Sequence, residues 1–208
     1  MTRPAPSLLQ PRKMPQQARS AATIEAIHIA TIQLLLADGV ARLTTTRVAE
    51  RAGVSVGTMY QYYPHKQALL FAIVERQLEK ITHAMLTATA RLEGSDLATV
   101  AEGLATAWID AKMADTLASR AIYGIAAEFD LDELMNRTLN HMVDVIARLL
   151  TSMPDARFID VRSNALMLAT MLGGSVRMAM EAEASEDHMT CLRQELPRAC
   201  RAYLAVAL

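Results

Sequence analysis

The stretch RAGVSVGTMYQYYPHKQALL, residues 51–70, contains the features that decide the fold of the N-terminal part of the chain. Gly53 interrupts one helix candidate, because glycine is a poor helix former. Ser55 can cap a short helix over about 56–62, and Pro64 ends it by disfavouring helical geometry in the preceding residue. A helix, a glycine turn and a short second helix predict a helix-turn-helix, whose second helix is presented to the major groove of DNA.

A helical wheel divides this short helix into two faces. At 100° per residue, Met59 and Tyr63 lie within 40° of each other, and we expect both in the core. The opposite face offers small and polar groups, of which Gln61 can read an adenine bidentately while hydroxyls hold phosphate oxygens. Tyr60 and Tyr62 flank that face, and for these two the closure of a small hydrophobic core is an equally good interpretation.

Residues 43–70, LTTTRVAERAGVSVGTMYQYYPHKQALL, closely resemble the DNA-binding signature of the tetracycline-repressor-like (TetR/AcrR) family of bacterial transcription regulators. The resemblance covers about fifty residues and includes the turn, the caps and the core positions together. It implies a homodimer that places two recognition helices on a palindromic DNA operator and leaves it when a small molecule binds the larger domain. The positions that it implies for DNA contact are Thr45, Thr46, Val56, Gly57, Thr58, Tyr60, Gln61, Tyr62 and Lys66.

Four positions depart from the commonest family pattern. Position 56, often polar or basic, is Val, so a base contact there would be apolar. Position 65, usually a good helix N-cap, is His, while Tyr63 stands for a usual Phe and Met59 for a usual Leu. None of these changes threatens the expected fold, but Val56 makes the operator hard to deduce.

The rest of the chain predicts an all-α protein. It has 208 residues, 52% of them apolar, with few glycines and prolines and long Ala-, Leu-, Met- and Glu-rich stretches. We expect a flexible basic arm over residues 1–18, a helix-turn-helix DNA-binding domain over 19–65, and a helical effector-binding and dimerisation domain over 66–208. A long helix from Lys66 to about Arg91 would couple the last two. Residues 1–66 carry eight Lys and Arg against three Asp and Glu, which suits a polyanion-binding part.

The large domain would hold the effector of the family mechanism. We expect an apolar or aromatic small molecule, although plain core packing explains methionines at helical spacing equally well. A constitutive regulator with a solid core and no effector is the alternative. The candidate lining residues are Trp108, Met113, Tyr123, Phe129, Met135, His141, Met142 and Arg177, with Asn140 as a further polar group.

A helix predicted over about 156–184 is apolar on two faces, so it must be covered by the core on one side and by a partner on the other. It also contains Gly173 and Gly174, which are unfavourable within a helix unless backbones approach closely. Coverage of the second face by the chain's own terminal helix, about 187–207, is the alternative. The predicted dimer interface consists of Met167, Met171, Gly174, Met178, Leu192, Leu196 and Tyr203.

Enzyme chemistry finds little support in the pattern of residues. The five histidines are dispersed without metal-type spacing, and the sequence shows neither a phosphate loop nor a nucleophile elbow. We therefore expect a protein that is not an enzyme and has no metal or cofactor. Cys191 and Cys200, nine positions apart, would lie on opposite faces of one helix. Without a secretory signal or a long apolar run, we expect a reduced, cytoplasmic protein that does not enter a membrane.

Overall fold

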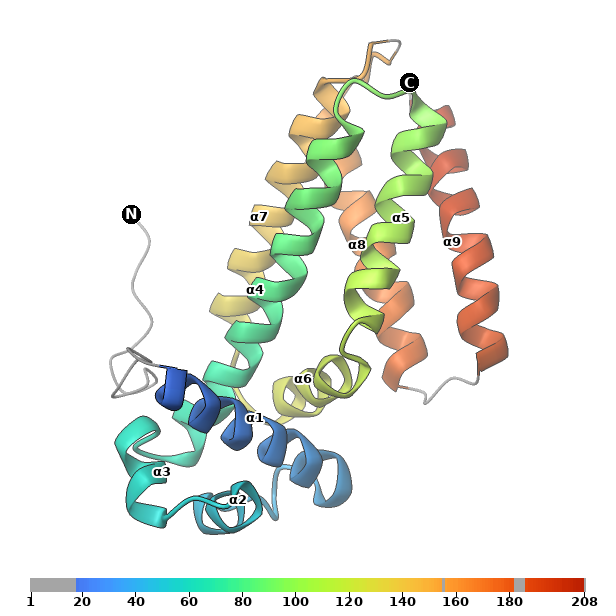
Figure 1. The fold of residues 1–208 in the computed structure, drawn as a ribbon. Coiled ribbons are helices and arrows are strands. Elements are labelled where there is room, and N and C mark those ends of the chain that lie inside the picture. The colour runs from blue at the N-terminus through green and yellow to red at the C-terminus, as the bar shows by residue number, and fades with distance from the viewer. Residues whose placement is uncertain (1–17, 155, 182–185, 208) are drawn as a thin grey trace. The chain divides into compact units, whose positions relative to one another are not determined.

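The computed structural model describes residues 18–154, 156–181 and 186–207. In these ranges all regular structure is helical, which confirms the all-α prediction (Figure 1). The predicted basic arm lies outside the described residues except for its last residue, at which the first helix begins. The helices are α1 (Ala18–Asp38), α2 (Thr45–Ala52), α3 (Val56–Tyr62), α4 (Lys66–Leu92), α5 (Leu97–Met113), α6 (Thr116–Glu128), α7 (Asp132–Thr151), α8 (Val161–Glu181) and α9 (Glu186–Val206).

The chain forms two compact units. The first consists of the residues up to Gln77 together with Leu117–Asp130, so it contains α1 to α3, the beginning of α4 and nearly all of α6. The second consists of Leu78–Thr116 and Leu131–Leu208. The first unit therefore holds the predicted helix-turn-helix, and the side chain of Gln77 ties the start of α4 to α6 by donating a hydrogen bond to Ser119 Oγ, 3.2 Å away.

Local sequence signals set the ends of α2 and α3. The hydroxyl of Thr44 accepts a hydrogen bond from the Arg47 amide at the start of α2, and Ser55 does the same for the Thr58 amide at the start of α3. Between the helices, Gly53 takes the left-handed conformation with φ of 68°, which glycine adopts without strain. The predicted helix of residues 56–62 is thereby confirmed.

The start of α4 has an unexpected cap. His65, which stands where a better N-cap was expected, accepts a hydrogen bond from the Ala68 amide through Nδ1 at 3.2 Å. The imidazole thus satisfies one of the amides that a helix N-terminus leaves without an intrahelical partner. The departure from the usual residue at this position therefore does not remove the capping function.

A polar network with a buried centre ties α3 to α1 and α4. Met59 and Tyr63 are buried, as the helical wheel predicts. The hydroxyl oxygen of Tyr63 lies 2.7 Å from Nε2 of buried His28 on α1, and the guanidinium of Arg76 on α4 donates to Nδ1 of the same ring at 3.1 Å. Arginine can only donate, so Nε2 carries the hydrogen and donates it to Tyr63. Arg76 also pairs with Glu25, which lies one turn before His28.

α1 is as apolar as a membrane-spanning helix, yet it contributes to the core of the first unit. Its segment Ser20–Asp38 has the length and the mean hydropathy, 1.4, of a membrane-spanning helix, although core helices of soluble proteins share these properties. In the structure α1 places Ile27, His28 and Thr31 in the core of the first unit.

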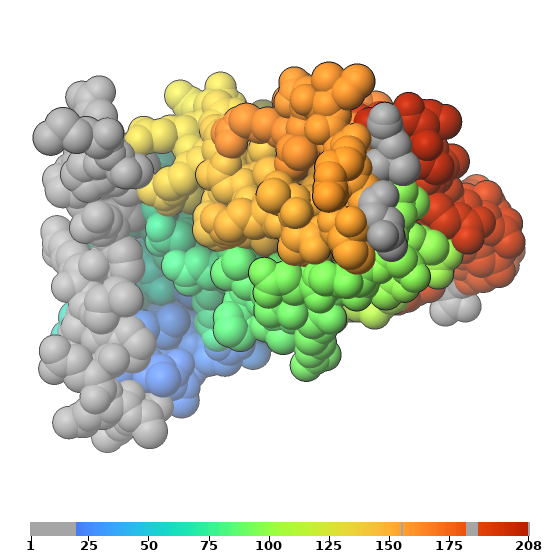
Figure 2. All heavy atoms as spheres, turned by 90° about the horizontal axis from the view of Figure 1, so that it is seen from above, coloured from blue at the N-terminus to red at the C-terminus, as the bar shows by residue number. Residues whose placement is uncertain are grey.

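The helices of the second unit run side by side (Figure 1). α5 packs against α9 and α8, and α8 packs against α7. Figure 2 looks onto one end of this unit, where the turn after α4 (green) lies beside the segment that follows α7 (orange). There the amide of Gly94 donates a hydrogen bond to Ser152 Oγ at 3.2 Å.

The predicted helix of about 156–184 is shorter in the structure. α8 begins only at Val161, because Asp160 acts as its N-cap and accepts hydrogen bonds from both the amide and the hydroxyl of Ser163. These bonds hold the pKa of Asp160 below its ordinary value. Phe158, which lies within the predicted range, therefore precedes the helix. The end of the prediction at 184 falls outside the described residues, and α8 is described to Glu181.

The Tyr63 hydroxyl can be tested by removing it alone. Tyr63→Phe should lower the free energy of unfolding by about 1–3 kcal/mol, because the buried N–H of His28 loses its acceptor. Chemical denaturation measures this difference. The matched control is Tyr60→Phe on the exposed side of α3, for which we expect a change within about 0.5 kcal/mol. Equal stability of Tyr63→Phe and the wild type would show that the network does not anchor α3.

Candidate DNA-binding surface and effector region

The outward side of α3 forms the centre of the candidate DNA-binding surface. Val56, Gly57, Tyr60 and Gln61 are exposed there, and Thr58 is half-buried. An added Cβ at Gly57 would meet only the hydroxyl of Ser55, at 3.7 Å. This side of the helix thus offers one amide, one phenol and one small aliphatic side chain, and the glycine leaves room for a close approach of another molecule.

The first turn of α2 adjoins this surface. Thr46 is exposed, and the hydroxyl of Thr45 donates a hydrogen bond to the phenol oxygen of Tyr60 at 3.3 Å. A helix N-terminus carries amides without intrahelical acceptors and a partial positive charge, both of which favour phosphate. Thr45, Thr46 and Tyr60 are therefore brought together at a place suited to the sugar-phosphate backbone.

Two residues of the predicted contact set have partners within the protein. Tyr62, placed by the sequence at the margin of the outward face, is buried in the structure, and its hydroxyl donates to Ser20 Oγ at 3.1 Å. Lys66 is half-buried, and its ammonium donates to the carbonyl oxygen of Val40 at 3.1 Å. The hydrogen bond to Ser20, on the first turn of α1, holds Tyr62 in this inward orientation. In both cases the structure shows a positioning role, and direct contact with DNA stays a prediction.

Arginines beside the helix-turn-helix are also held in place. Arg47 forms an ion pair with Asp38, and this hydrogen bond is the main reason why the pKa of Asp38 lies below its ordinary value. Arg47 also donates to the carbonyl oxygen of Arg42 at 2.8 Å. Arg51 donates to the side-chain oxygen of Gln33 at 2.9 Å. Arg47 and Arg51 thus have fixed positions beside the helix-turn-helix.

The predicted effector residues are distributed over both units. Tyr123 is buried and Phe129 half-buried in the first unit, whereas the other members belong to the second. In the second unit the structure places Met142 in the core, Trp108, Met113 and Met135 at half-buried positions, and Asn140, His141 and Arg177 at exposed positions. The structure does not gather these residues around one described cavity, so their role stays a prediction.

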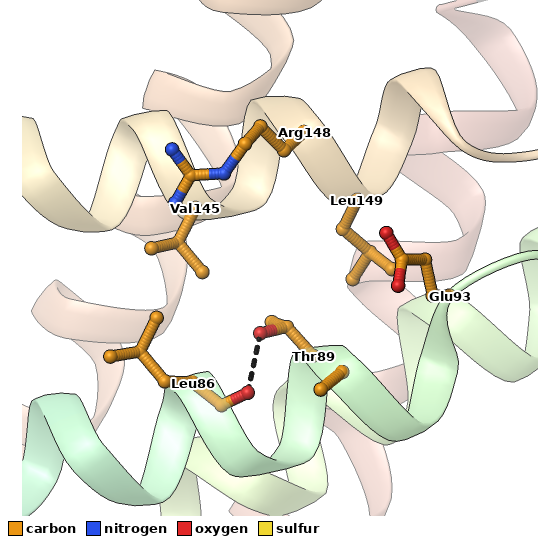
Figure 3. A pocket seen from close by; sticks show the side chains of 7 residues that line it. Leu86, Thr89, Glu93, Val145, Arg148 and Leu149 are labelled. Carbon is orange, nitrogen blue, oxygen red and sulfur yellow. Dashed lines mark hydrogen bonds between the residues drawn. The ribbon is translucent and has the colours of Figure 1, made fainter.

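A surface groove in the second unit is lined by residues outside the predicted effector set. It lies between α4 and α7 and has a volume of about 200 Å³. Figure 3 shows Leu86 and Val145 facing each other across it, with Arg148 and Glu93 at its rims. None of the residues predicted for the effector pocket borders this groove, and its volume is below the ~300–1,000 Å³ typical of pockets for small organic molecules.

Lys112 is a feature of α5 that the sequence analysis did not single out. Its side chain is buried, with 4% of the residue exposed, and its ammonium lies 5.5 Å from the centre of the Trp108 ring. Burial lowers the pKa of Lys112 to about 8, and the charge of Arg177 on α8 acts in the same direction. A lysine at the edge of an apolar stripe is ordinarily solvated, so no sequence signal distinguishes this one.

No group of three or more His, Cys, Asp or Glu side chains that could hold a metal ion occurs among the described residues.

Of the two cysteines, Cys191 is exposed and Cys200 is buried, in agreement with their expected opposite faces on one helix. Burial raises the pKa of the Cys200 thiol to about 11.

Comparison with family models identifies the chain. A model described as "Tetracyclin repressor-like, C-terminal domain" matches residues 96–204, and one described as "Bacterial regulatory proteins, tetR family" matches residues 27–73. The first match alone spans more than half of the chain. The chain therefore belongs to the tetracycline-repressor-like family, and it is a DNA-binding transcription regulator of the helix-turn-helix type.

Individual relatives agree with this assignment. The nucleoid occlusion factor SlmA of Actinobacillus pleuropneumoniae is 30% identical over 131 residues, a match that covers 62% of this chain and 64% of that protein. The chain thus spans less than two thirds of the length of that relative. A putative TetR-family regulator from Mesorhizobium loti has a similar structure, with a TM-score of 0.73, 19% identity, and coverage of 91% of this chain and 98% of the other. The structure of a SmeT–triclosan complex has a TM-score of 0.68 and 23% identity, and the match covers 89% of this chain and 91% of the other.

Proposed function

We propose that this protein is a homodimeric repressor that binds a palindromic operator through α3 and leaves it when a small molecule binds the C-terminal part. The observation that carries the DNA-binding half of the proposal is the division of α3 into a fixed inward face and an exposed outward one. Met59 is fully buried, while Gln61 and Tyr60 project on the outward side. As a chromosome-binding regulator the protein would act in the cytoplasm, and neither catalysis nor a membrane is part of this mechanism.

The individual side chains would divide into positioning and reading groups. Thr45, Thr46 and Tyr60 would hold phosphate oxygens around the first turn of α2, and Thr58 would add a hydroxyl at the start of α3. Gln61 would read a base edge, and Val56, which is 38% exposed, would contact an apolar group such as a thymine methyl. Gly57, which has no side chain, would leave room for DNA to approach α3 closely. Tyr62 and Lys66 would act mainly by holding α3 in place.

The dimer proposal rests on the exposed face of α8. Met167, Met171, Gly174 and Met178 fall within 60° of one another at 100° per residue. Met167 is 45% exposed and Met178 74% exposed, so the chain's own terminal helix does not cover this face. Outside the neighbouring backbone of α8, an added Cβ at Gly174 would meet none of the described atoms within 4 Å. The described part of the chain therefore gives no reason for the mid-helix glycine, and close approach by the α8 of a second copy would supply one.

On α9 the predicted interface residues differ in exposure. Leu192 and Tyr203 are half-buried and can contribute to a helix-helix interface with a second copy. Leu196 is buried within the unit, with 4% of the residue exposed, so its first role is in the chain's own core.

The effector half of the proposal rests on the second unit as a separate compact body and on Trp108, Met113 and Met135, which are half-buried in it. A second candidate function is a DNA-binding regulator that works without an effector, and it is favoured by the predicted effector residues, none of which lines the described groove between α4 and α7. Mapping of bound sites over the genome separates the two. A small molecule that raises the melting temperature and releases these sites supports the inducible repressor, whereas sites that stay occupied under all growth conditions support the second candidate.

The reading role of Gln61 gives a direct test of the proposed surface. Gln61→Ala should relax the preference for one base pair in each operator half-site by about 1–3 kcal/mol. Tyr60→Phe, its matched control, should weaken binding to all sequences alike, since a phosphate contact carries no sequence information. Selection of operators from random DNA by the wild type and both variants measures this. Unchanged base preferences of Gln61→Ala would assign sequence reading to another residue.

The α8 interface can be tested with a charge. Gly174→Glu should give a folded monomer, because the position is open within one chain but would bury a carboxylate between two. Loss of the second half-site should weaken binding to the palindrome by about 100-fold or more. Sedimentation velocity and a binding assay measure these effects, with Leu117→Glu, another exposed position, as the control. A dimeric Gly174→Glu protein with intact helicity would place the interface elsewhere.

A further inference from the structure

The groove between α4 and α7 combines an apolar interior with two opposite charges at its rims (Figure 3). Leu86 of α4 faces Val145 of α7 across it, and Leu149 continues the α7 wall. Val145 and Leu149 are buried, whereas Leu86 is 39% exposed. A groove of this kind is suited to a molecule that has an apolar body and polar ends.

The two charges stand at different ends of the groove. Figure 3 shows the guanidinium of Arg148 beside Val145 and the carboxylate of Glu93 beside Leu149. Both charged residues are exposed, and neither side chain forms an ion pair or a hydrogen bond with another described residue. Both charges are therefore available to a bound molecule. Because they lie apart, the charges of a matching molecule must lie apart as well.

A hydroxyl group between the two charges offers an acceptor. Thr89 is buried and lines the groove. Its Oγ1 donates to the backbone carbonyl oxygens of Met85 and Leu86, at 2.9 Å and 3.1 Å, and Figure 3 marks the second of these bonds. A hydroxyl has lone pairs that can accept while its hydrogen is donated. An N–H group of a molecule in the groove can therefore donate to Thr89.

We infer that this groove binds a dipeptide with an apolar side chain, whose free ammonium contacts Glu93 and whose free carboxylate contacts Arg148. A guanidinium can hold a carboxylate through two parallel N–H bonds, and the peptide N–H is the donor for Thr89. A single α-amino acid matches less well, because both of its charges are attached to one carbon atom.

The size of the groove agrees with this ligand class. A volume of about 200 Å³ is small for the organic molecules that fill typical pockets, but a dipeptide is a smaller molecule, and in an open groove part of it stays in solvent. No residue predicted for the effector pocket lines the groove. The inference therefore goes beyond the proposed function, and the site can exist whether or not its ligand acts on DNA binding.

Chemically matched ligands test the two charge contacts one at a time. We would titrate the full-length protein with leucyl-leucine in a calorimeter, and then with N-acetyl-leucyl-leucine, which lacks the ammonium, and with leucyl-leucine amide, which lacks the carboxylate. Each blocked form should bind about tenfold more weakly, because it loses one hydrogen bond between charged groups. Glycyl-glycine keeps both charges but has no apolar side chain, so it should also bind more weakly than leucyl-leucine.

Two variants assign each charge of the ligand to its residue. Glu93→Gln should bind leucyl-leucine about tenfold more weakly and should no longer distinguish it from the N-acetyl form. Arg148→Gln should in the same way lose the preference for the free carboxylate over the amide. The matched controls are Glu79→Gln and Arg91→Gln, which change exposed residues of α4 outside the groove and should keep both preferences. All four positions are exposed, so the variants should remain folded.

The outcomes separate this inference from the proposed function. Equal binding of leucyl-leucine and its two blocked forms, unchanged preferences of both groove variants, or no binding at millimolar concentration would overturn the dipeptide site. Operator affinity is measured in parallel. Release of the operator by leucyl-leucine from the wild type but not from Glu93→Gln would make the groove an effector site. Binding without release would retain the dipeptide site and leave the repressor with another effector, whereas a wild type that binds no palindrome would contradict the proposed function alone.

Discussion

The hydrogen bond between Tyr63 and His28 is the interaction on which the DNA-binding surface depends. α3 has only seven residues, and a helix of that length is unstable by itself in water, where even Ala-rich helices need about 12–15 residues. Its geometry must therefore come from tertiary contacts. Tyr63, at the C-terminal end of α3, contacts His28 on α1, and Arg76 on α4 holds the other nitrogen of that ring. Burial of Met59 fixes the rotation of the helix, so its polar side faces outward.

The same network links the reading helix to the longest helix of the chain. Arg76 lies at the end of the part of α4 that belongs to the first unit, and the helix continues without a break into the second. A displacement of α4 would act on His28 and, through it, on Tyr63. In the proposed mechanism, effector binding would use this covalently continuous path. The packing around buried His28 and Tyr63 would make the displacement of α3 switch between two positions, because a packed core changes between discrete arrangements and does not deform smoothly.

Much of the N-terminal unit could be predicted from the sequence because its signals are local. The caps at Thr44 and Ser55, the glycine turn and the periodicity of α3 act over a few residues. The inward direction of Tyr62 could not be predicted with certainty, because a tyrosine at the margin of a face suits either side until its hydroxyl meets Ser20. The start of α8 was placed too early for a related reason. Asp160 is a good N-cap, but the apolar residues before it continue the helical pattern.

The second unit shows where sequence reasoning ends. Lys112 looks like a solvated residue beside an apolar stripe, and only its tertiary surroundings make it a buried cation. The exposed methionines of α8 were predicted from the two apolar faces of the helix, whereas the empty space around Gly174 required coordinates. An exposed apolar helix face costs stability in an isolated chain. Such departures from local consistency are expected at functional sites, and here the exposed face of α8 supports the proposed contact with a second copy.

The most direct test of the central claim, that α3 reads DNA from the position set by its buried anchors, is a structure of the protein on an operator selected from random DNA. The account predicts α3 in the major groove, with the Gln61 amide within about 3.2 Å of a base edge. It also predicts that Tyr63 keeps its hydrogen bond to His28 in the complex. A complex in which α3 lies outside the groove, or in which another surface of the chain contacts the bases, would contradict it.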